Sequence, residues 1–392
     1  MKKRLSALLV FALLLVSLRT AAVAQNAAPI EINIMLSMTG PASFLGHAEG
    51  DAFQALQTMV NARGGINGRP IKLVISDDTS SAQVALQLAN SFIANKVQVF
   101  LGSPLASACA SFLPLIAKTG PVDYCLSPPV RPPSGGYVFT AGASAYDLTT
   151  ALIRYFREKG MTRFAVLTTT DATGHDFEAG YLGVLARPEN KGLVLVGNEH
   201  FNPTDISTTA QLAHLKAANP QVLLTGTVGT PTGTILRGVQ DVGLDIPIVA
   251  VNGNMLYQEM AQFASIMPKE LIFPSYRAMS EGDVRPGPIQ NAQHDFFGAL
   301  KAAKLRPDAA SVTGWDPLMI VLSALQKLGP NATADQIHTY IETLHGFAGV
   351  NGIYDFRDGG QRGIGTQAIV VDRWDPAKNA FVVLSKPGGS PK

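Results

Sequence analysis

The sequence predicts an α/β protein of two doubly wound, Rossmann-like lobes with parallel sheets. Three observations support this prediction. The chain has 392 residues, more than one hydrophobic core usually organises. Hydrophobic residues make up 46% of it, which is enough for substantial cores. Short apolar runs alternate with helical patterns, and this alternation restarts after a segment rich in Pro and Gly, residues 127–136.

The first 24 residues have the three parts of a secretory signal peptide. Basic residues 2–4 precede an apolar run at 6–18, and Ala22-Val23-Ala24 gives the small-x-small cleavage pattern. The apolar run is shorter than the roughly twenty residues that cross a bilayer. We therefore expect residues 1–24 to be removed and the mature protein to lie outside the cytoplasm.

In the first lobe, short apolar runs predict buried strands because parallel strands are covered on both faces. The strands are expected at 30–35, 71–76, 97–101 and 122–126. Helices are expected at 47–63, 84–93 and 107–118. The second of these helices shows the clearest periodicity, since Val84, Leu88 and Phe92 recur at fourfold spacing.

The second lobe repeats the pattern and ends in a different one. Its strands are expected at 163–168, 193–197, 222–225 and 246–251, and its helices at 177–186, 209–218 and 232–242. Three further helices are expected at 288–303, 312–328 and 334–344. The tail predicts antiparallel strands at 353–356, 366–371 and 380–384, with Gly359-Gly360 as a turn.

Composition and missing motifs argue against several function classes. A net charge of +2, with no basic run after the N-terminal segment, gives no electrostatic basis for binding nucleic acid. The sequence lacks GxSxG, GxxxxGK[ST], HExxH and CxxC, so we expect neither an enzyme nor a bound cofactor or metal. Asp77-Asp78 is best interpreted as a turn at a helix entry. Asp176 is either a catalytic candidate beside His175 or a residue whose negative charge interacts favourably with the dipole at the start of the next helix.

Two loops at strand ends predict a polar cradle, because open parallel sheets bind ligands at that edge. Residues 102–107 follow one strand and enter a helix, where hydroxyls and free N–H groups favour an anion such as a carboxylate. Ser127 follows the neighbouring strand. Two ordinary loops remain the alternative. Cys109 and Cys125 lie close to this edge, either as a disulfide or as two small buried side chains.

The chain resembles the periplasmic solute-binding proteins of the Leu/Ile/Val-binding family, which deliver ligands to ABC importers. The resemblance rests on an ordered series of motifs across nearly the whole mature chain. The opening motif SGP…G of the family is similar to TGP at residues 39–41, followed by Gly46. Its motif NAxGGIxG is similar to NARGGING at residues 61–68. Further matches are DD at 77–78, TDIS at 204–207, Arg237 with Gly243-Leu244, GWD at 314–316 and FAGVNG at 347–352.

This resemblance implies the type I periplasmic binding protein fold, with three crossovers between the lobes and hinge closure around the ligand. The crossovers are expected near 139–143, 274–278 and 346–354. Lobe 1 is then 28–141 plus 277–347, and lobe 2 is 142–276 plus 348–386. The resemblance also implies a periplasmic monomer that binds a small molecule and meets an inner-membrane ABC permease. A ligand sensor on the same fold is the alternative.

The resemblance also implies a set of ligand-binding positions. The first-lobe serine of the family aligns with Ala106, one residue before Ser107, and an aromatic aligns with Leu45. The acid that clamps the ammonium group of amino acids aligns with Asn252. The expected ligand-binding residues are Phe44, Leu45, Ser103, Leu105, Ala106, Ser107, Ser127, Pro128, Pro129, Thr173, Val228, Asn252 and Tyr276.

The neutral Asn252 has a consequence for the ligand. A buried ammonium group without a countercharge costs several kcal/mol. An amide hydrogen-bonds a hydroxyl or carbonyl instead. The hypothesis is therefore a ligand with a carboxylate and no α-amino group, such as an aromatic acid or another organic acid. Branched-chain or other amino acids are the alternative.

Overall fold

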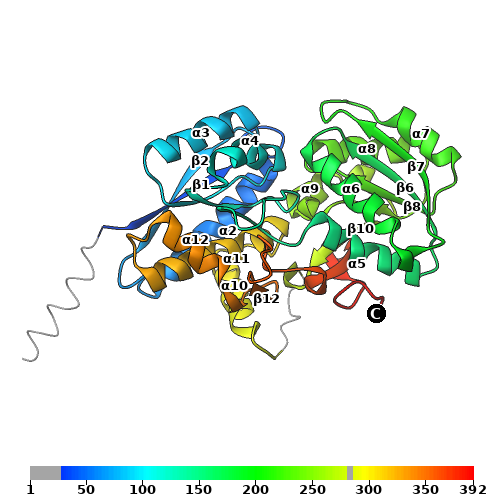
Figure 1. Ribbon diagram of the computed structural model, residues 1–392. Helices are drawn as coiled ribbons and strands as arrows, with labels where there is room; N and C mark the ends of the chain where they lie inside the picture. Colours follow the sequence, from blue (N-terminus) through cyan, green and yellow to red (C-terminus); the bar gives the residue numbers. More distant parts are fainter. Residues whose placement is uncertain (1–27, 280–285) are drawn as a thin grey trace, which may run out of the picture.

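The computed structural model describes residues 28–279 and 286–392, and its chain forms two α/β lobes (Figure 1). The predicted signal peptide lies outside the described residues. Within the described ranges, no helix is long and apolar enough to cross a membrane. The predicted fold class is confirmed: each lobe has helices packed on a largely parallel sheet.

Lobe 1 is built on a five-stranded parallel sheet in the order β2-β1-β3-β4-β5. The strands are β1 (Ile30–Leu36), β2 (Ile71–Asp77), β3 (Val99–Leu101), β4 (Val122–Cys125) and β5 (Val138–Thr140). The helices are α2 (Ser43–Ala62), α3 (Ala82–Ala94), α4 (Ala106–Ile116), α10 (Gln290–Ala302), α11 (Ala309–Leu328) and α12 (Ala334–Glu342). Helices α3 and α4 cover one face of the sheet, whereas α2, α11 and α12 lie on the other (Figure 1).

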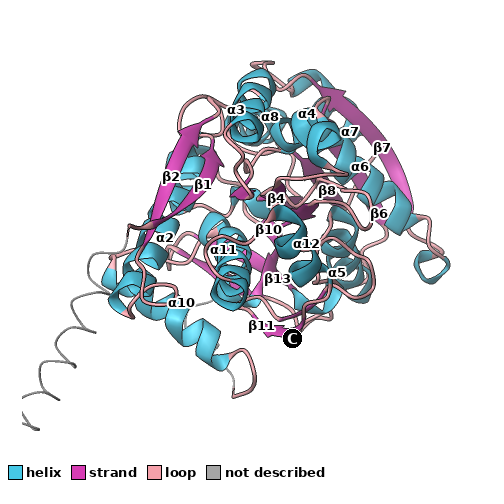
Figure 2. Ribbon diagram, turned by 60° about the vertical axis from the view of Figure 1, so that its left-hand side comes forward, coloured by secondary structure: helices cyan, strands magenta, loops and turns pink. Residues whose placement is uncertain are grey.

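Lobe 2 has a seven-stranded mixed sheet in the order β14-β13-β10-β9-β8-β6-β7. The strands are β6 (Arg163–Thr169), β7 (Val194–Phe201), β8 (Val222–Gly226), β9 (Ile248–Val249), β10 (Leu271–Tyr276), β13 (Ile369–Asp375) and β14 (Ala380–Val383). The helices are α5 (Ala145–Glu158), α6 (Ala172–Leu185), α7 (Thr209–Ala217), α8 (Thr230–Val242) and α9 (Tyr257–Gln262). Strand β7 forms the outer edge (Figure 2), and β13 and β14 add antiparallel strands at the other edge, as the tail pattern predicted.

Several elements escaped the sequence patterns. Strand β5 has only three residues and lies where the sequence indicated a link. Strand β10 contains Pro274, which cannot donate a ladder hydrogen bond and so weakens a strand prediction. Helix α2 begins at Ser43, four residues before its predicted start. Strand β11 (His345–Ala348) was not predicted; it pairs with β12 (Ile353–Asp355), which the tail pattern did predict, in a hairpin that stands apart from both large sheets.

Hydrogen bonds fix the segments through which the chain passes between the lobes. The backbone N–H of Ala143 donates to the Tyr276 hydroxyl at 2.6 Å. The Asp316 carboxylate accepts from the N–H groups of Val350 and Asn351, at 2.8 and 3.1 Å. These bonds hold the connecting segments in place. The residue ranges expected for the two lobes remain a prediction.

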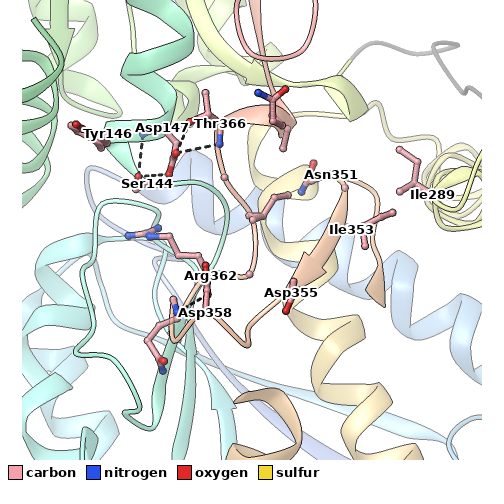
Figure 3. Close-up of a pocket in the computed structure, with 18 of the residues that line it drawn as sticks. Ser144, Tyr146, Asp147, Ile289, Asn351, Ile353, Asp355, Asp358, Arg362 and Thr366 are labelled. Atoms are coloured by element: carbon pink, nitrogen blue, oxygen red, sulfur yellow. Dashed lines mark hydrogen bonds between the residues drawn. The ribbon is translucent and has the colours of Figure 1, made fainter. Parts of the chain in front are cut away.

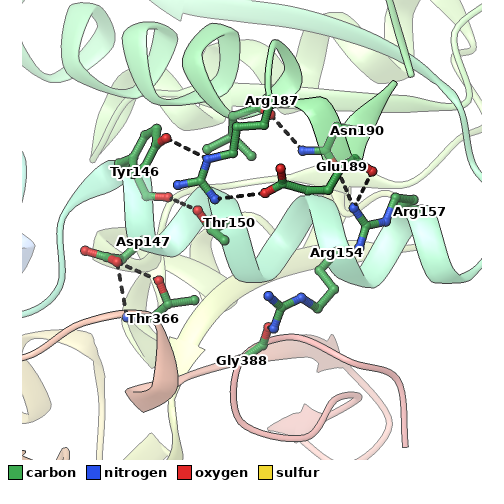
Figure 4. A network of polar contacts seen from close by, with 11 residues as sticks. Tyr146, Asp147, Thr150, Arg154, Arg157, Arg187, Glu189, Asn190, Thr366 and Gly388 are labelled. Atoms are coloured by element: carbon green, nitrogen blue, oxygen red, sulfur yellow. Dashed lines mark hydrogen bonds and ion pairs between the residues drawn. The ribbon is translucent and has the colours of Figure 1, made fainter. Parts of the chain in front are cut away.

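The C-terminal segment is attached to lobe 2 through α5 (Figure 4). Asp147 accepts hydrogen bonds from the backbone and hydroxyl of Thr366, and Arg154 donates to the carbonyl oxygen of Gly388 at 2.8 Å. On the same helix, Tyr146 receives a hydrogen bond from Arg187. The last strands of the chain are therefore bound to the lobe whose sheet they complete.

A disulfide joins Cys109 in α4 to Cys125 at the end of β4. Both side chains are fully buried, so the bond ties a helix to the sheet inside the core of lobe 1. The sequence left open whether Cys109 and Cys125 form a disulfide or are two separate buried side chains, and the structure has the disulfide.

Candidate functional site

A cavity of about 40 Å³ lies between the lobes, where the loops after the strands meet. Lobe 1 contributes Leu45 and Glu49 from α2, the loop at Leu126–Pro129, and Ala309, Ala310 and Thr313 from α11. Lobe 2 contributes Thr173 and Phe177 from α6, Val228, and the segment Val251–Gly253. Both lobes therefore contact whatever occupies the cavity, which is the condition for a ligand to favour closure.

More than half of the residues expected to bind the ligand line this one cavity. They are Leu45, Ser127, Pro128, Pro129, Thr173, Val228 and Asn252. These residues come from three separate strand-end loops and from helices α2 and α6, and the structure brings them together from positions far apart in the sequence.

The other expected positions lie outside the cavity lining. Ser103 is fully buried, and its hydroxyl donates to the Asp78 carboxylate and accepts from the N–H of Leu105. Phe44 lines a neighbouring hollow with His47 and Tyr257. The remaining expected positions are Leu105, Ala106 and Ser107 at the start of α4, and the hinge residue Tyr276.

Local backbone structure positions the lobe 2 side chains. Asp171 caps α6 by accepting from the N–H of Gly174 at 2.9 Å, which places Thr173 in the first turn at the cavity. Asn254 binds the connection between β8 and α8, since its side chain accepts from Gly229 and Thr232 and donates to the carbonyl oxygen of Thr227. The segment containing Asn252 is held in place by these bonds.

Glu49 is a cavity residue that the sequence interpretation missed. It lies one helical turn after Leu45, on the same face of α2, and only 2% of it is exposed. Its Oε2 has no hydrogen-bond partner among the described residues. Burial, and then the nearby charges of Asp308 and Asp78, raise the pKa of Glu49 well above its usual range. A charged residue on the buried face of a helix was the available signal.

Direct contacts hold the two lobes against each other around the cavity. Arg131 of lobe 1 forms an ion pair with Asp176 of lobe 2, with Nε and Oδ1 2.6 Å apart. The N–H of Ala309 in lobe 1 donates to the carbonyl oxygen of Met255 in lobe 2 at 3.0 Å. The lobes are therefore closed upon each other. Asp176, a catalytic candidate in the sequence, has an ion-pair partner across the interface.

A larger hollow of about 1200 Å³ lies on the hinge side (Figure 3). Its wall includes Asp147, Asn351 and Arg362, which the sequence did not single out. The guanidinium of Arg362 donates to the carbonyl oxygen of Val130, and burial lowers its pKa to about 10.

Known proteins match this chain over most of its length. A sequence profile described as "Periplasmic binding protein" matches residues 29–379. The Leu/Ile/Val-binding protein BraC3 of Rhizobium johnstonii is 19% identical over 324 residues, covering 80% of this chain and 84% of that protein.

Solved structures share the fold. A solute-binding protein of an ABC transporter from Rhodopseudomonas palustris, in complex with benzoate, has a TM-score of 0.76 at 17% identity and covers 93% of this chain and 97% of its own. The branched-chain amino acid binding protein LivJ of Streptococcus pneumoniae, in complex with isoleucine, has a TM-score of 0.73 at 19% identity, covering 91% and 99%. The chain therefore belongs to the periplasmic binding protein family, in the branch of the Leu/Ile/Val-binding proteins, as its motifs predicted.

Proposed function

We propose that the protein is the periplasmic binding component of an ABC importer and that its ligand is a small organic acid without an amino group. The chemical class of the ligand is inferred from the charge of the side chains that line the cavity. Asn252 is neutral, and Glu49 is the one ionisable side chain among the described residues of the lining. Burial raises the pKa of this carboxyl, which disfavours the charged form that an ammonium group needs as its partner.

The size of the cavity limits the ligand further. A cavity of about 150 Å³ is known to accept benzene, whereas this one measures about 40 Å³. A short-chain carboxylic acid is closer in volume to this cavity than an aromatic acid is. An aromatic acid requires the lobes to stand further apart than they do here, which hinge motion supplies in this kind of fold. Benzoate in a structural neighbour supports the aromatic case.

Isothermal titration calorimetry at neutral pH tests the ligand class. Propionate, isobutyrate and benzoate are compared with leucine, isoleucine and valine. Heat from at least one acid and none from the amino acids is the expected result. Binding of leucine, with no response to any acid, would contradict the proposal and favour the alternative, amino-acid transport, which the isoleucine complex of a neighbour supports.

The variant Asn252→Asp sharpens this test. An added carboxylate repels an acid ligand and supplies a countercharge for an ammonium group. We expect acid binding to weaken at least tenfold, about 1.4 kcal/mol. Asn202→Asp, on an exposed loop of lobe 2, is the control. Uptake by proteoliposomes that contain the permease then separates transport from sensing on the same fold.

A further inference from the structure

The Oε2 atom of Glu49 is a buried polar atom of the interlobe cavity wall without a hydrogen-bond partner among the described residues. Glu49 lies on α2, beside the cavity, with 2% exposure. A buried polar group without a partner costs free energy, so such groups need an explanation. A ligand in the cavity that hydrogen-bonds this carboxyl supplies one.

The surroundings of Glu49 set its protonation. The charges that act on it come from Asp308, which caps α11, and from Asp78, which follows β2. On α2 itself, His47 and Asp51 are the nearest titratable residues in sequence. From lobe 2, no ionisable side chain belongs to the described lining. Both acting charges are negative and the site is buried, so the neutral carboxyl is favoured.

A neutral carboxyl has a different role from an ionised one. It donates through its O–H, whereas a carboxylate only accepts. No Lys or Arg of the described chain lines the cavity, so an acid ligand has no cationic partner there. The available donors are Ser127, Thr173, Thr313, the amide of Asn252 and, when it is protonated, Glu49. Glu49 is the strongest acid among them and hence the strongest donor.

We propose that Glu49 determines the specificity of the cavity by binding the ligand as a neutral carboxylic acid, with its O–H donated to a carboxylate oxygen of the ligand. This inference rests on the proposed function. When Glu49 is already protonated, no proton is exchanged on binding. Above the pH at which free Glu49 ionises, the protein takes up one proton with each ligand, so affinity falls by up to about tenfold per pH unit.

The test measures the dissociation constants of benzoate and isobutyrate between pH 5.5 and pH 9 by calorimetry. The variants are Glu49→Gln, which keeps a donor that does not titrate, and Glu49→Ala, which removes it. Glu259→Gln is the matched control, because Glu259 is buried in lobe 2 outside the cavity lining. Thermal melts show that each variant is folded.

We expect wild-type affinity to fall at high pH, and Glu49→Gln to stay within a few-fold of the wild-type value at pH 6 across the whole range. Glu49→Ala is expected to lose about tenfold or more, and Glu259→Gln to follow the wild type. If the wild type binds an acid and Glu49→Gln shows the same pH dependence of affinity, this inference is overturned, whereas the proposed function stands. Leucine binding that strengthens with pH and disappears in Glu49→Gln overturns both proposals. Binding of no acid at any pH overturns the proposed function, and this inference with it.

Discussion

The two lobes present different chemistry to the cavity they share. The lobe 1 side has Glu49 in its wall, with Asp78 and Asp308 close behind, and a disulfide in the core of that lobe. The lobe 2 side offers Thr173, Asn252 and apolar groups. The difference indicates that lobe 1 carries the group that recognises ligand charge, whereas lobe 2 supplies shape and neutral hydrogen bonds. We therefore expect the ligand to dock first on lobe 1.

Two buried glutamates make the comparison quantitative. Glu49 lines the cavity, whereas Glu259 on α9 lies outside its lining. Neither Glu259 oxygen has a hydrogen-bond partner among the described residues, and burial raises the pKa of Glu259 to about 8. We therefore expect the same residue type to affect ligand binding in lobe 1 and stability alone in lobe 2.

The largest expected effect is the pH dependence of stability caused by Glu259. Its pKa is about 8 in the folded state and near 4.5 when unfolded. Between these values the folded state holds more protons, so the free energy of unfolding falls as pH rises, by up to about 1.4 kcal/mol per pH unit. Glu259→Gln is expected to flatten this slope in urea titrations at pH 5, 6.5 and 8. An equally steep slope in the variant would show that other groups cause it.

Loss of the disulfide comes next. Cys109 and Cys125 are separated by 16 positions, and a loop of that length predicts a loss of about 3 kcal/mol in Cys109→Ser/Cys125→Ser. The chain has one tryptophan in each lobe, Trp315 on α11 and Trp374 on β13. Trp374→Phe leaves a fluorescent reporter of lobe 1, and Trp315→Phe one of lobe 2. A transition that shifts only in the lobe 2 reporter would contradict the prediction.

A smaller effect is expected at the contact between lobes formed by Gly229. Its φ is +73°, and a Cβ there would come within 2.7 Å of the Pro41 carbonyl oxygen in lobe 1. Gly229→Ala should hinder closure and weaken ligand binding about tenfold, some 1.4 kcal/mol. Gly243→Ala, at the other end of α8 and also at positive φ, has no such neighbour in lobe 1. Equal loss of affinity in both variants would assign the effect to backbone strain.

The smallest effect is expected for the ion pair between the lobes. Arg131 is largely exposed, at 58% of its side chain, and such pairs contribute about 1 kcal/mol or less. Arg131→Gln should therefore weaken ligand binding by no more than about fivefold, and less at high salt. Lys72→Gln, which breaks an exposed pair with Glu31 inside lobe 1, is the control. An unchanged dissociation constant at low salt would show that the pair does not favour closure.

The sequence predicted most of the architecture because buried parallel strands and amphipathic helices leave clear periodic patterns. It failed where the pattern was short or broken, as in β5 and at Pro274 in β10. Asn252 and Thr173, which line the cavity, were expected there from the resemblance to the Leu/Ile/Val-binding family, with whose ligand positions they align. The sequence interpretation missed Glu49, although this glutamate falls on the apolar face of α2 with Leu45 and Phe53, where a charged side chain is unusual. Ser103 was expected at the ligand, but its bond to Asp78 depends on the separation of two loops.

The position of β13 has a consequence for how the chain folds. The sheet of lobe 1 has all its strands once residue 140 has been made, whereas the sheet of lobe 2 gains its last strands only at residues 369–383. Pairing of β10 with β13 thus spans about a hundred residues, and contacts so distant in sequence form slowly. Lobe 1 also lacks α10, α11 and α12 until residue 342 has been made, so during synthesis both lobes wait for late segments and lobe 2 is completed last.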